Sequence, residues 1–190
     1  KVQSDGKILV YGTFTSYDSQ PVKNVVRFNP DFTLDNSFDF DSSITFPFGL
    51  SPIGYHLFVQ SDGKIIIGGR INCVQGVKYF VRINEDGSFD NSFNSAVVEQ
   101  VDHIVAMQND NKLLVSLYNS SSSSNPGRVF RLNLDGSIDN SFNLGSGFSS
   151  TILTKILVLQ NGKIIALGGF DSYNGVSVRK GIVKLNQDGT

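Results

Sequence analysis

The stretch VRINEDGSFDNSF, residues 81–93, decides the fold because the chain repeats it. Related segments are VRFNPDFTLDNSF at 26–38, FRLNLDGSIDNSF at 130–142 and KLNQDGT at 184–190. A second phrase recurs with it, as VQSDGKILVYGTF at 2–14, VQSDGKIIIGGRI at 59–71, MQNDNKLLVSLYN at 107–119 and LQNGKIIALGGF at 159–170. Both phrases return about every 50 residues, a period that is typical of β-propeller blades when it is built from short strands.

Two basic residues mark each repeat. The lysines of the second phrase are Lys7, Lys64, Lys112 and Lys163, and the basic residues of the first phrase are Arg27, Arg82, Arg131 and Lys184. We therefore expect residues 1–190 to be a single fragment of a propeller array. Because the chain opens and closes inside repeats, we also expect the array to continue in a longer polypeptide.

The turn residues predict how each repeat folds. Asp62-Gly63 lies between two apolar runs and predicts a hairpin with a type I′ turn, since glycine accepts the positive φ that this turn requires. Asn111 takes the glycine position in the third copy and tolerates the same backbone. The fourth copy keeps Asn161-Gly162 and is expected to be one residue shorter.

Apolar residues alternate with polar ones in the segment that precedes the second turn. In YFVRIN, Phe80, Arg82 and Asn84 share one face, and Val81 and Ile83 share the other. Each unit thus supplies about four short strands, and no segment shows sustained helical periodicity. We predict an all-β fold, a β-propeller of four-stranded antiparallel blades, with about three and a half blades in this chain.

The polar residues of 81–93 have a second interpretation as metal ligands. Asn84, Asp86 and Asp90 could offer oxygen atoms. An EF-hand loop, however, needs glycine at its sixth position and a bidentate glutamate at its twelfth, and this segment has neither that spacing nor that glutamate. Asp, Asn and Gly are the ordinary residues of turns. We therefore favour turns and expect no metal site and no cofactor.

Composition limits the classes of partner. A formal net charge of −1 argues against non-specific binding to nucleic acid or to an anionic membrane, which requires clustered Lys and Arg. No run approaches the ~18–20 apolar residues of a membrane-spanning helix. Cys73 is the only cysteine, so the chain forms no internal disulfide and no cysteine-based metal site.

The two phrases together read Q-x-D-G-K-I-hydrophobic-x-G-G-F and R-L-N-x-D-G-S-hydrophobic-D-x-S-F. They closely resemble the delta-sixty repeat, a bacterial β-propeller repeat of unknown function, over nearly the whole chain. The resemblance implies a propeller domain inside a large secreted or surface protein of bacteria, with a phage virion as the alternative. It carries no catalytic residues. The third copy departs most, with Asn111 at the turn and SLYN at 116–119.

Function on a repeat scaffold usually lies where the copies differ. The insertion 39–58 carries Phe46, Phe48 and Tyr55, and exposed aromatics on a loop would suit sugar rings or an apolar patch of a partner. Packing between blades is the commoner role of phenylalanine. Tyr17 and Tyr173 occupy matching loop positions and are candidate ligand-binding residues, with a repeated structural role as the alternative.

Catalytic patterns are sparse. His56 and His103 are the only histidines, and neither lies in a metalloprotease or nucleophile motif. Asp39 and Asp41 form a close acidic pair, although aspartates at alternate strand positions are commonly just solvated. Carboxylates from different blades could still meet across a central channel, as in propeller glycosidases.

Two classes of function follow from these patterns. We expect a non-catalytic module, a spacer or an adhesin-like platform for protein or glycan at a cell surface, joined to the remaining blades of the same longer chain. We expect neither nucleic-acid binding nor membrane insertion. The alternative is a propeller enzyme acting on polysaccharide, or a phage tail or receptor-binding component.

Overall fold

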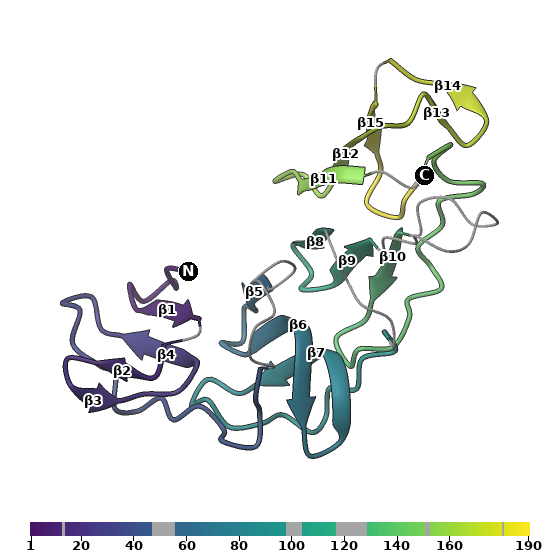
Figure 1. Ribbon diagram of the computed structural model, residues 1–190. Coiled ribbons are helices and arrows are strands. Elements are labelled where there is room, and N and C mark those ends of the chain that lie inside the picture. Colours follow the sequence, from purple (N-terminus) through teal and green to yellow (C-terminus); the bar gives the residue numbers. More distant parts are fainter. Residues whose placement is uncertain (13, 47–55, 98–103, 117–128, 151–152, 180) are drawn as a thin grey trace. The chain divides into compact units, whose positions relative to one another are not determined.

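A computed structural model of the protein describes residues 1–12, 14–46, 56–97, 104–116, 129–150, 153–179 and 181–190. The regular secondary structure in these ranges consists of β-strands (Figure 1). The strands pair in an antiparallel manner. The chain divides into two compact units, Lys1–Phe93 and Asn94–Thr190, each of which is described by itself. No helix in the described ranges is long and apolar enough to cross a membrane.

The first unit holds two repeats. In the first repeat, β1 (Ile8–Tyr11) pairs with β4 (Val25–Phe28), and a small ribbon of β2 (Ser16–Tyr17) and β3 (Gln20–Pro21) lies between them in sequence. In the second repeat, β5 (His56–Val59), β6 (Ile65–Cys73) and β7 (Gly76–Ile83) form one sheet in that order.

The second unit repeats this plan. Its third repeat is the sheet of β8 (Ile104–Met107), β9 (Leu113–Ser116) and β10 (Val129–Leu132). Its fourth repeat is the sheet of β11 (Leu153–Val158), β12 (Ile164–Gly168) and β15 (Ile182–Leu185), with a ribbon of β13 (Ser172–Tyr173) and β14 (Val176–Ser177). The expected all-β repeat is confirmed.

The fourth strand of each blade is shorter than expected. It is a single bridge in each of the first three repeats, and these bridges are Phe28↔Leu34, Ile83↔Phe89 and Leu132↔Ile138. The next residue along the chain is an aspartate that turns the backbone. In the second repeat, for example, Asp90 accepts a hydrogen bond from the Ser92 N–H at 2.9 Å. The turn takes the chain away from β7 after one paired residue.

The turns at the Asx-Gly pairs are confirmed in place but differ in type. The Gln60 N–H donates to the Lys64 carbonyl and the Gly63 N–H donates to the Gln60 carbonyl, so the loop has three residues. Gly63 has a φ of 81°, whereas Asp62 is not in the left-handed region. A type I′ turn needs two such residues, so this is a type I turn closed by a glycine bulge.

The fourth copy of this turn has the same length as the others. The Leu159 N–H donates to the Lys163 carbonyl and the Gly162 N–H donates to the Leu159 carbonyl. The expected deletion of one residue is therefore wrong, because Leu159 takes the place that Gln60 has in the second copy. Asn111 adopts a φ of 62°, as expected for a substitute for glycine.

True type I′ turns lie elsewhere, at the tips of the two small ribbons. Asp18 and Ser19 have φ values of 46° and 62°, and Asn174 and Gly175 have values of 52° and 76°. These two-residue tips match the right-handed twist of their ribbons.

The central strands are buried on both faces, as predicted for the run at 65–67. Ile65, Ile66 and Ile67 are each at most 1% exposed. Val81 and Ile83 lie in the same core as Ile65 and Ile67, in agreement with the predicted alternation. The glycine pair 68–69 lies at a shift of the β6–β7 register, which confirms the expected bulge.

Candidate functional site

A cluster of charged side chains recurs at the same place in the first three repeats. It is built from a lysine that follows the first turn, an arginine on the strand before the second turn, and an aspartate eight positions after that arginine. In the second repeat, Arg82 Nε donates to Asp90 Oδ2 at 2.7 Å, and Lys64 Nζ contacts the same oxygen at 2.8 Å. The strands therefore bring two cations to one carboxylate oxygen.

The other two copies have the same geometry. Their members are Lys7, Arg27 and Asp35 in the first repeat, and Lys112, Arg131 and Asp139 in the third. The three aspartates are between 6% and 8% exposed, and the three arginines between 4% and 7%. Each guanidinium also lies over the ring of a phenylalanine, with its carbon between 4.9 and 5.2 Å from the centroid; these rings are Phe38, Phe93 and Phe142.

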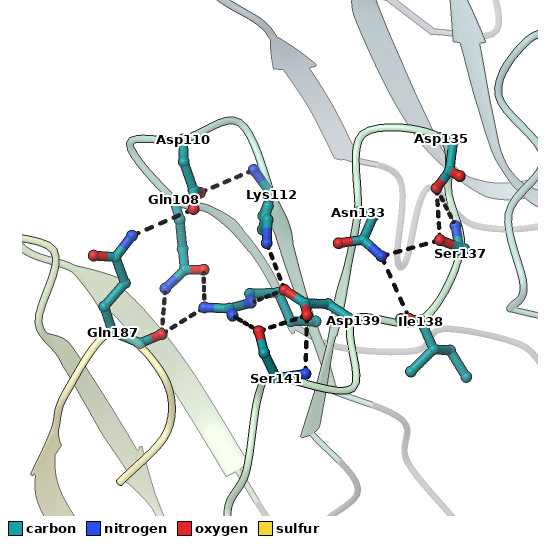
Figure 2. A network of polar contacts seen from close by, with 11 residues as sticks. Gln108, Asp110, Lys112, Asn133, Asp135, Ser137, Ile138, Asp139, Ser141 and Gln187 are labelled. Carbon is teal, nitrogen blue, oxygen red and sulfur yellow. Dashed lines mark hydrogen bonds and ion pairs between the residues drawn. The ribbon is translucent and has the colours of Figure 1, made fainter.

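The second oxygen of each aspartate accepts hydrogen bonds within the turn that follows it. Asp90 Oδ1 accepts hydrogen bonds from the Ser92 N–H at 2.9 Å and from its Oγ at 2.6 Å. Figure 2 shows the same arrangement in the third repeat, where Ser141 and Lys112 converge on Asp139. One carboxylate thus receives two donors on each of its oxygens.

These contacts keep the aspartates ionised. Burial by itself raises the pKa of Asp90, but the hydrogen bonds from Lys64, Ser92 and Arg82 outweigh it and hold that pKa well below its usual range. The pKa values of Asp35 and Asp139 are lowered in the same way, again against the effect of burial. The carboxylate is therefore a firmly charged anchor.

Arg27 and Arg131 also reach the next repeat. Arg27 Nη1 donates to the Glu85 carbonyl at 2.7 Å, and Arg131 Nη1 donates to the Gln187 carbonyl at 2.8 Å. Gln108 Nε2 binds the same Gln187 carbonyl at 3.1 Å (Figure 2). Both carbonyls belong to the second turn of the repeat that follows the arginine.

The main chain forms a second link at the same turns. The residue after the Ser-Phe pair donates its N–H at 2.8 Å to the main-chain carbonyl of the turn aspartate in the following repeat; these pairs are Asp39 with Asp86, Asn94 with Asp135, and Asn143 with Asp188. The turn glycine makes this approach possible. A Cβ on Gly87 would lie 2.6 Å from the Asp39 carbonyl oxygen, and one on Gly136 would lie 2.7 Å from the Asn94 carbonyl carbon.

The first repeat carries Phe32 where the other copies have this glycine. Phe32 adopts the left-handed φ of 66°, and its side chain is 65% exposed. The turn therefore keeps its backbone at the cost of local strain.

Of the predicted aromatic site in the insertion, the described residues include Phe46. It packs against the core cluster of the first unit, and its ring stacks on Phe40 with centroids 6.1 Å apart and planes at 10°. Phe40 is 2% exposed. Phe48 and Tyr55 lie outside the described residues. The structure thus gives Phe46 a packing role, and its predicted ligand contact stays a prediction.

The two candidate tyrosines have one structural role in common. Tyr17 Oη donates to the Phe32 carbonyl at 3.1 Å, and Tyr173 Oη donates to the Gly189 carbonyl, which belongs to the equivalent residue of the fourth repeat. Tyr173 is 8% exposed, and burial raises its pKa to about 12, with a further contribution from Asp188. Tyr17 is 40% exposed. Ligand binding by these tyrosines also stays a prediction.

The remaining chemical candidates are dispersed. His56 stacks on Phe58, and burial lowers its pKa. His103 lies outside the described residues. Asp41 is held by the N–H groups of Ser43 and Phe89, and the hydrogen bonds from Ser43 are the main cause of its lowered pKa. Asp39 pairs with Lys23 at 2.8 Å.

In the ranges that the structure describes, no three His, Cys, Asp or Glu side chains are grouped so that they could hold a metal ion. The oxygen atoms of Asp86 and Asp90, which the sequence left open as ligands, bind Ser88 and the Lys64–Arg82–Ser92 set. Their contacts agree with the favoured interpretation as structural residues.

The chain matches one family model in four segments, residues 3–38, 60–93, 108–142 and 159–190. Its description is "Domain of unknown function (DUF5122) beta-propeller", and the segments together cover more than half of the chain. The chain belongs to this family. No curated protein matches it. The expected β-propeller repeat of unknown function is thereby confirmed.

The family repeat coincides with the polar framework described above. The first three matched segments each contain the lysine, arginine, aspartate and serine of one cluster. Tyr17 and Tyr173 also lie inside matched segments, whereas Phe46, Phe48 and Tyr55 lie in the unmatched residues 39–59. The charged cluster was missed in the sequence, although Arg, Asp, Ser and Phe at a constant spacing in three copies were the signal for it.

Proposed function

We propose that the chain is a non-catalytic β-propeller module of a large bacterial surface or secreted protein. It acts as a spacer or an adhesin-like platform that binds a protein or glycan at a cell surface. Residues 1–190 are one fragment of a longer array, and its remaining blades pack with those described above. The resemblance to the delta-sixty repeat supports the extracellular or cell-surface location.

The single observation that supports the proposal is that the repeated Lys, Arg and Asp side chains bind one another within the fold. A general base needs a pKa near the working pH and a free lone pair within reach of a substrate. Asp90 has a lowered pKa, is 6% exposed and receives two donors on each oxygen. Such a carboxylate is suited to holding strands and poorly suited to moving protons.

Partner binding is then expected in the segments that differ between the repeats. The insertion 39–58 carries the aromatic residues with the greatest capacity for contact with sugar rings or apolar patches. The net charge of −1 makes a neutral or mixed surface a better partner than nucleic acid. No membrane insertion is needed for this role.

A binding assay on cells tests the proposal. The intact protein, labelled with a fluorophore, is titrated onto bacterial and host cells before and after periodate oxidation of glycans or protease treatment of surface proteins. We expect saturable binding that one of the two treatments removes. Absence of saturable binding would contradict the platform role. Cleavage of a polysaccharide that is lost in Asp39→Asn or Asp41→Asn would favour the enzyme instead.

Variants of the insertion test the location of the binding site. Replacing Phe46, Phe48 and Tyr55 together by Ala should weaken cell binding by about tenfold with an unchanged far-UV spectrum. Phe32→Ala is the control, because Phe32 is an exposed aromatic within the repeat. If the triple variant unfolds, Phe48→Ala with Tyr55→Ala keeps the Phe46 side chain, which packs against the core. Unchanged cell binding in a folded variant would remove the insertion as the site.

A further inference from the structure

A cavity of about 360 Å³ lies in the first unit. Its wall consists of the hairpin end 20–23, strand β4 and the segment 34–40, all from the first repeat. Its volume falls within the range of pockets that hold small ligands. Of the predicted site residues that the structure describes, Tyr17, Phe46 and Tyr173 do not line it.

The cavity runs along the edge of β4 that faces away from β1, and the Phe28↔Leu34 bridge occupies the far end of this edge. The Arg27 carbonyl accepts a hydrogen bond from the Asp35 N–H at 2.9 Å, so the main-chain groups of Arg27 point away from β1. Main-chain groups two residues apart in a strand point to the same edge, which directs the N–H and C=O of Val25 the same way. Val25 lines the cavity and is 1% exposed. A buried donor and acceptor at this edge call for a polar occupant, either water or a ligand.

Two amide side chains at the cavity are arranged differently from their counterparts in the second repeat. Gln20 and Asn36 line it in the first repeat, and both are exposed. Their equivalents in the second repeat are Gln75 and Asn91, and Gln75 Nε2 donates to Asn91 Oδ1 at 3.2 Å. That bond joins the hairpin tip to the turn. Among the described residues of the first repeat, Gln20 and Asn36 form no such bond, which leaves the two amides available to another molecule.

The charges of the lining cancel in pairs. Lys23 Nζ lies 2.8 Å from Asp39 Oδ1, and Arg27 Nε lies 2.6 Å from Asp35 Oδ2. The lining thus contains two cations and two carboxylates and carries no net charge of its own, while Lys7, which shares Asp35 with Arg27, lies outside the lining. Its remaining groups are amides and main-chain atoms, next to apolar side chains of Val26, Leu34 and others.

We propose that this cavity binds a neutral sugar residue, such as the end of a glycan chain; this rests on the proposed binding function and names a site for it. A pyranose ring carries hydroxyl groups that both donate and accept, and it has an apolar C–H face. Gln20 and Asn36 bind the hydroxyls, each as donor and acceptor. Val26 and Leu34 face the C–H groups of the ring.

The proposal is tested with a fixed set of neutral sugars on the intact protein. The probes are the methyl glycosides of glucose, galactose, mannose and N-acetylglucosamine, together with maltose, cellobiose and lactose, followed by saturation-transfer NMR and calorimetry. N-acetylneuraminic acid is the anionic comparison. At least one neutral sugar should bind saturably. Gln20→Ala with Asn36→Ala should weaken that binding by about tenfold, because two hydrogen-bonding side chains are lost.

The matched control is Gln75→Ala with Asn91→Ala in the second repeat, which should leave sugar binding unchanged. Saturable binding by none of the neutral sugars, binding by the anionic sugar alone, or equal binding by the Gln20/Asn36 variant would each overturn the proposal. The cell assay distinguishes a failure of the cavity assignment from a failure of the proposed binding function. If the protein still binds cells, only the cavity assignment fails, and if it binds neither cells nor sugars, the platform function fails as well.

Discussion

Arg131 and Gln187 lie 56 residues apart in the sequence, and Arg131 Nη1 donates a hydrogen bond to the Gln187 carbonyl at 2.8 Å. Arg27 makes the equivalent bond to the Glu85 carbonyl at 2.7 Å, across 58 residues. Each arginine also holds an aspartate of its own repeat through Nε. One side chain thus secures a turn within its repeat and joins that repeat to the next.

Adding a methyl group at the turn should break the main-chain link. Gly87→Ala places a Cβ 2.6 Å from the Asp39 carbonyl oxygen, and this backbone atom cannot move aside as a side-chain end could. We expect a loss of about 2–4 kcal/mol in the free energy of unfolding, measured with urea, from strain at positive φ together with the clash. Gly76→Ala is the control, since Gly76 has a φ of 95° with nothing within 4 Å of the added atom. Equal losses would show that only backbone strain matters.

Restoring glycine at the first turn should stabilise the protein. Phe32 has a left-handed φ of 66° and a side chain that is 65% exposed, so Phe32→Gly removes strain with little loss of packing. The gain should be about 1 kcal/mol by urea denaturation. A loss of stability would instead show that the Phe32 ring packs on a neighbour.

The two tyrosines should differ in their contribution to stability. Tyr173→Phe leaves the Gly189 carbonyl without its buried donor, and we expect a loss of about 1–2 kcal/mol. Tyr17→Phe removes the equivalent bond to Phe32 at an exposed position, where water replaces it, and should cost less than about 1 kcal/mol. Thermal unfolding of both variants measures the difference. If both keep full stability but lose cell binding, the hydroxyls act on a ligand as the sequence first indicated.

Much of the fold was predictable because it depends on local chemistry. Glycine and asparagine mark the turns through the backbone they tolerate, so Gly63 and Asn111 identified equivalent positions despite their different side chains. The type of turn was not predictable from the Asx-Gly dipeptide. Asx-Gly fits both a type I′ turn and a type I turn with a glycine bulge, and strand pairing beyond the turn decides between them.

The candidate site was less predictable because its contacts are long-range. Asp90 was correctly interpreted as a turn residue, but one aspartate has two oxygens, and the second binds Lys64 across 26 residues. Gln20 and Asn36 looked like ordinary loop residues. Their difference from Gln75 and Asn91 became visible only once the structure showed which pair is hydrogen-bonded.

Stability should fall in acid because of the buried aspartates. Asp35, Asp90 and Asp139 have lowered pKa values in the folded protein, whereas unfolded aspartate titrates near 3.9. The unfolded chain therefore binds protons first. The stabilisation is present above about pH 4 and is lost as the pH falls through the folded pKa values. Urea midpoints measured from pH 6 to pH 2.5 should decline below about pH 4, and a flat profile would contradict the ion-pair geometry.

We propose that the repeated aspartates hold the fold rather than act on a substrate. Asp90 and Asp86 offer a matched comparison. In both, Oδ1 accepts from the N–H and Oγ of the serine two residues later, but only Asp90 also binds Lys64 and Arg82. The difference between Asp90→Ala and Asp86→Ala therefore isolates the buried ion pairs.

The deciding measurement is the free energy of unfolding of these two variants by urea denaturation at pH 7, with cell binding and polysaccharide cleavage assayed in parallel. We predict a loss of about 3–5 kcal/mol for Asp90→Ala, because two cations are left without their partner, and less than about 1 kcal/mol for Asp86→Ala. An Asp90→Ala variant that is as stable as the wild-type protein, and that has lost a polysaccharide-cleaving activity shown by the wild-type protein, would contradict this structural role.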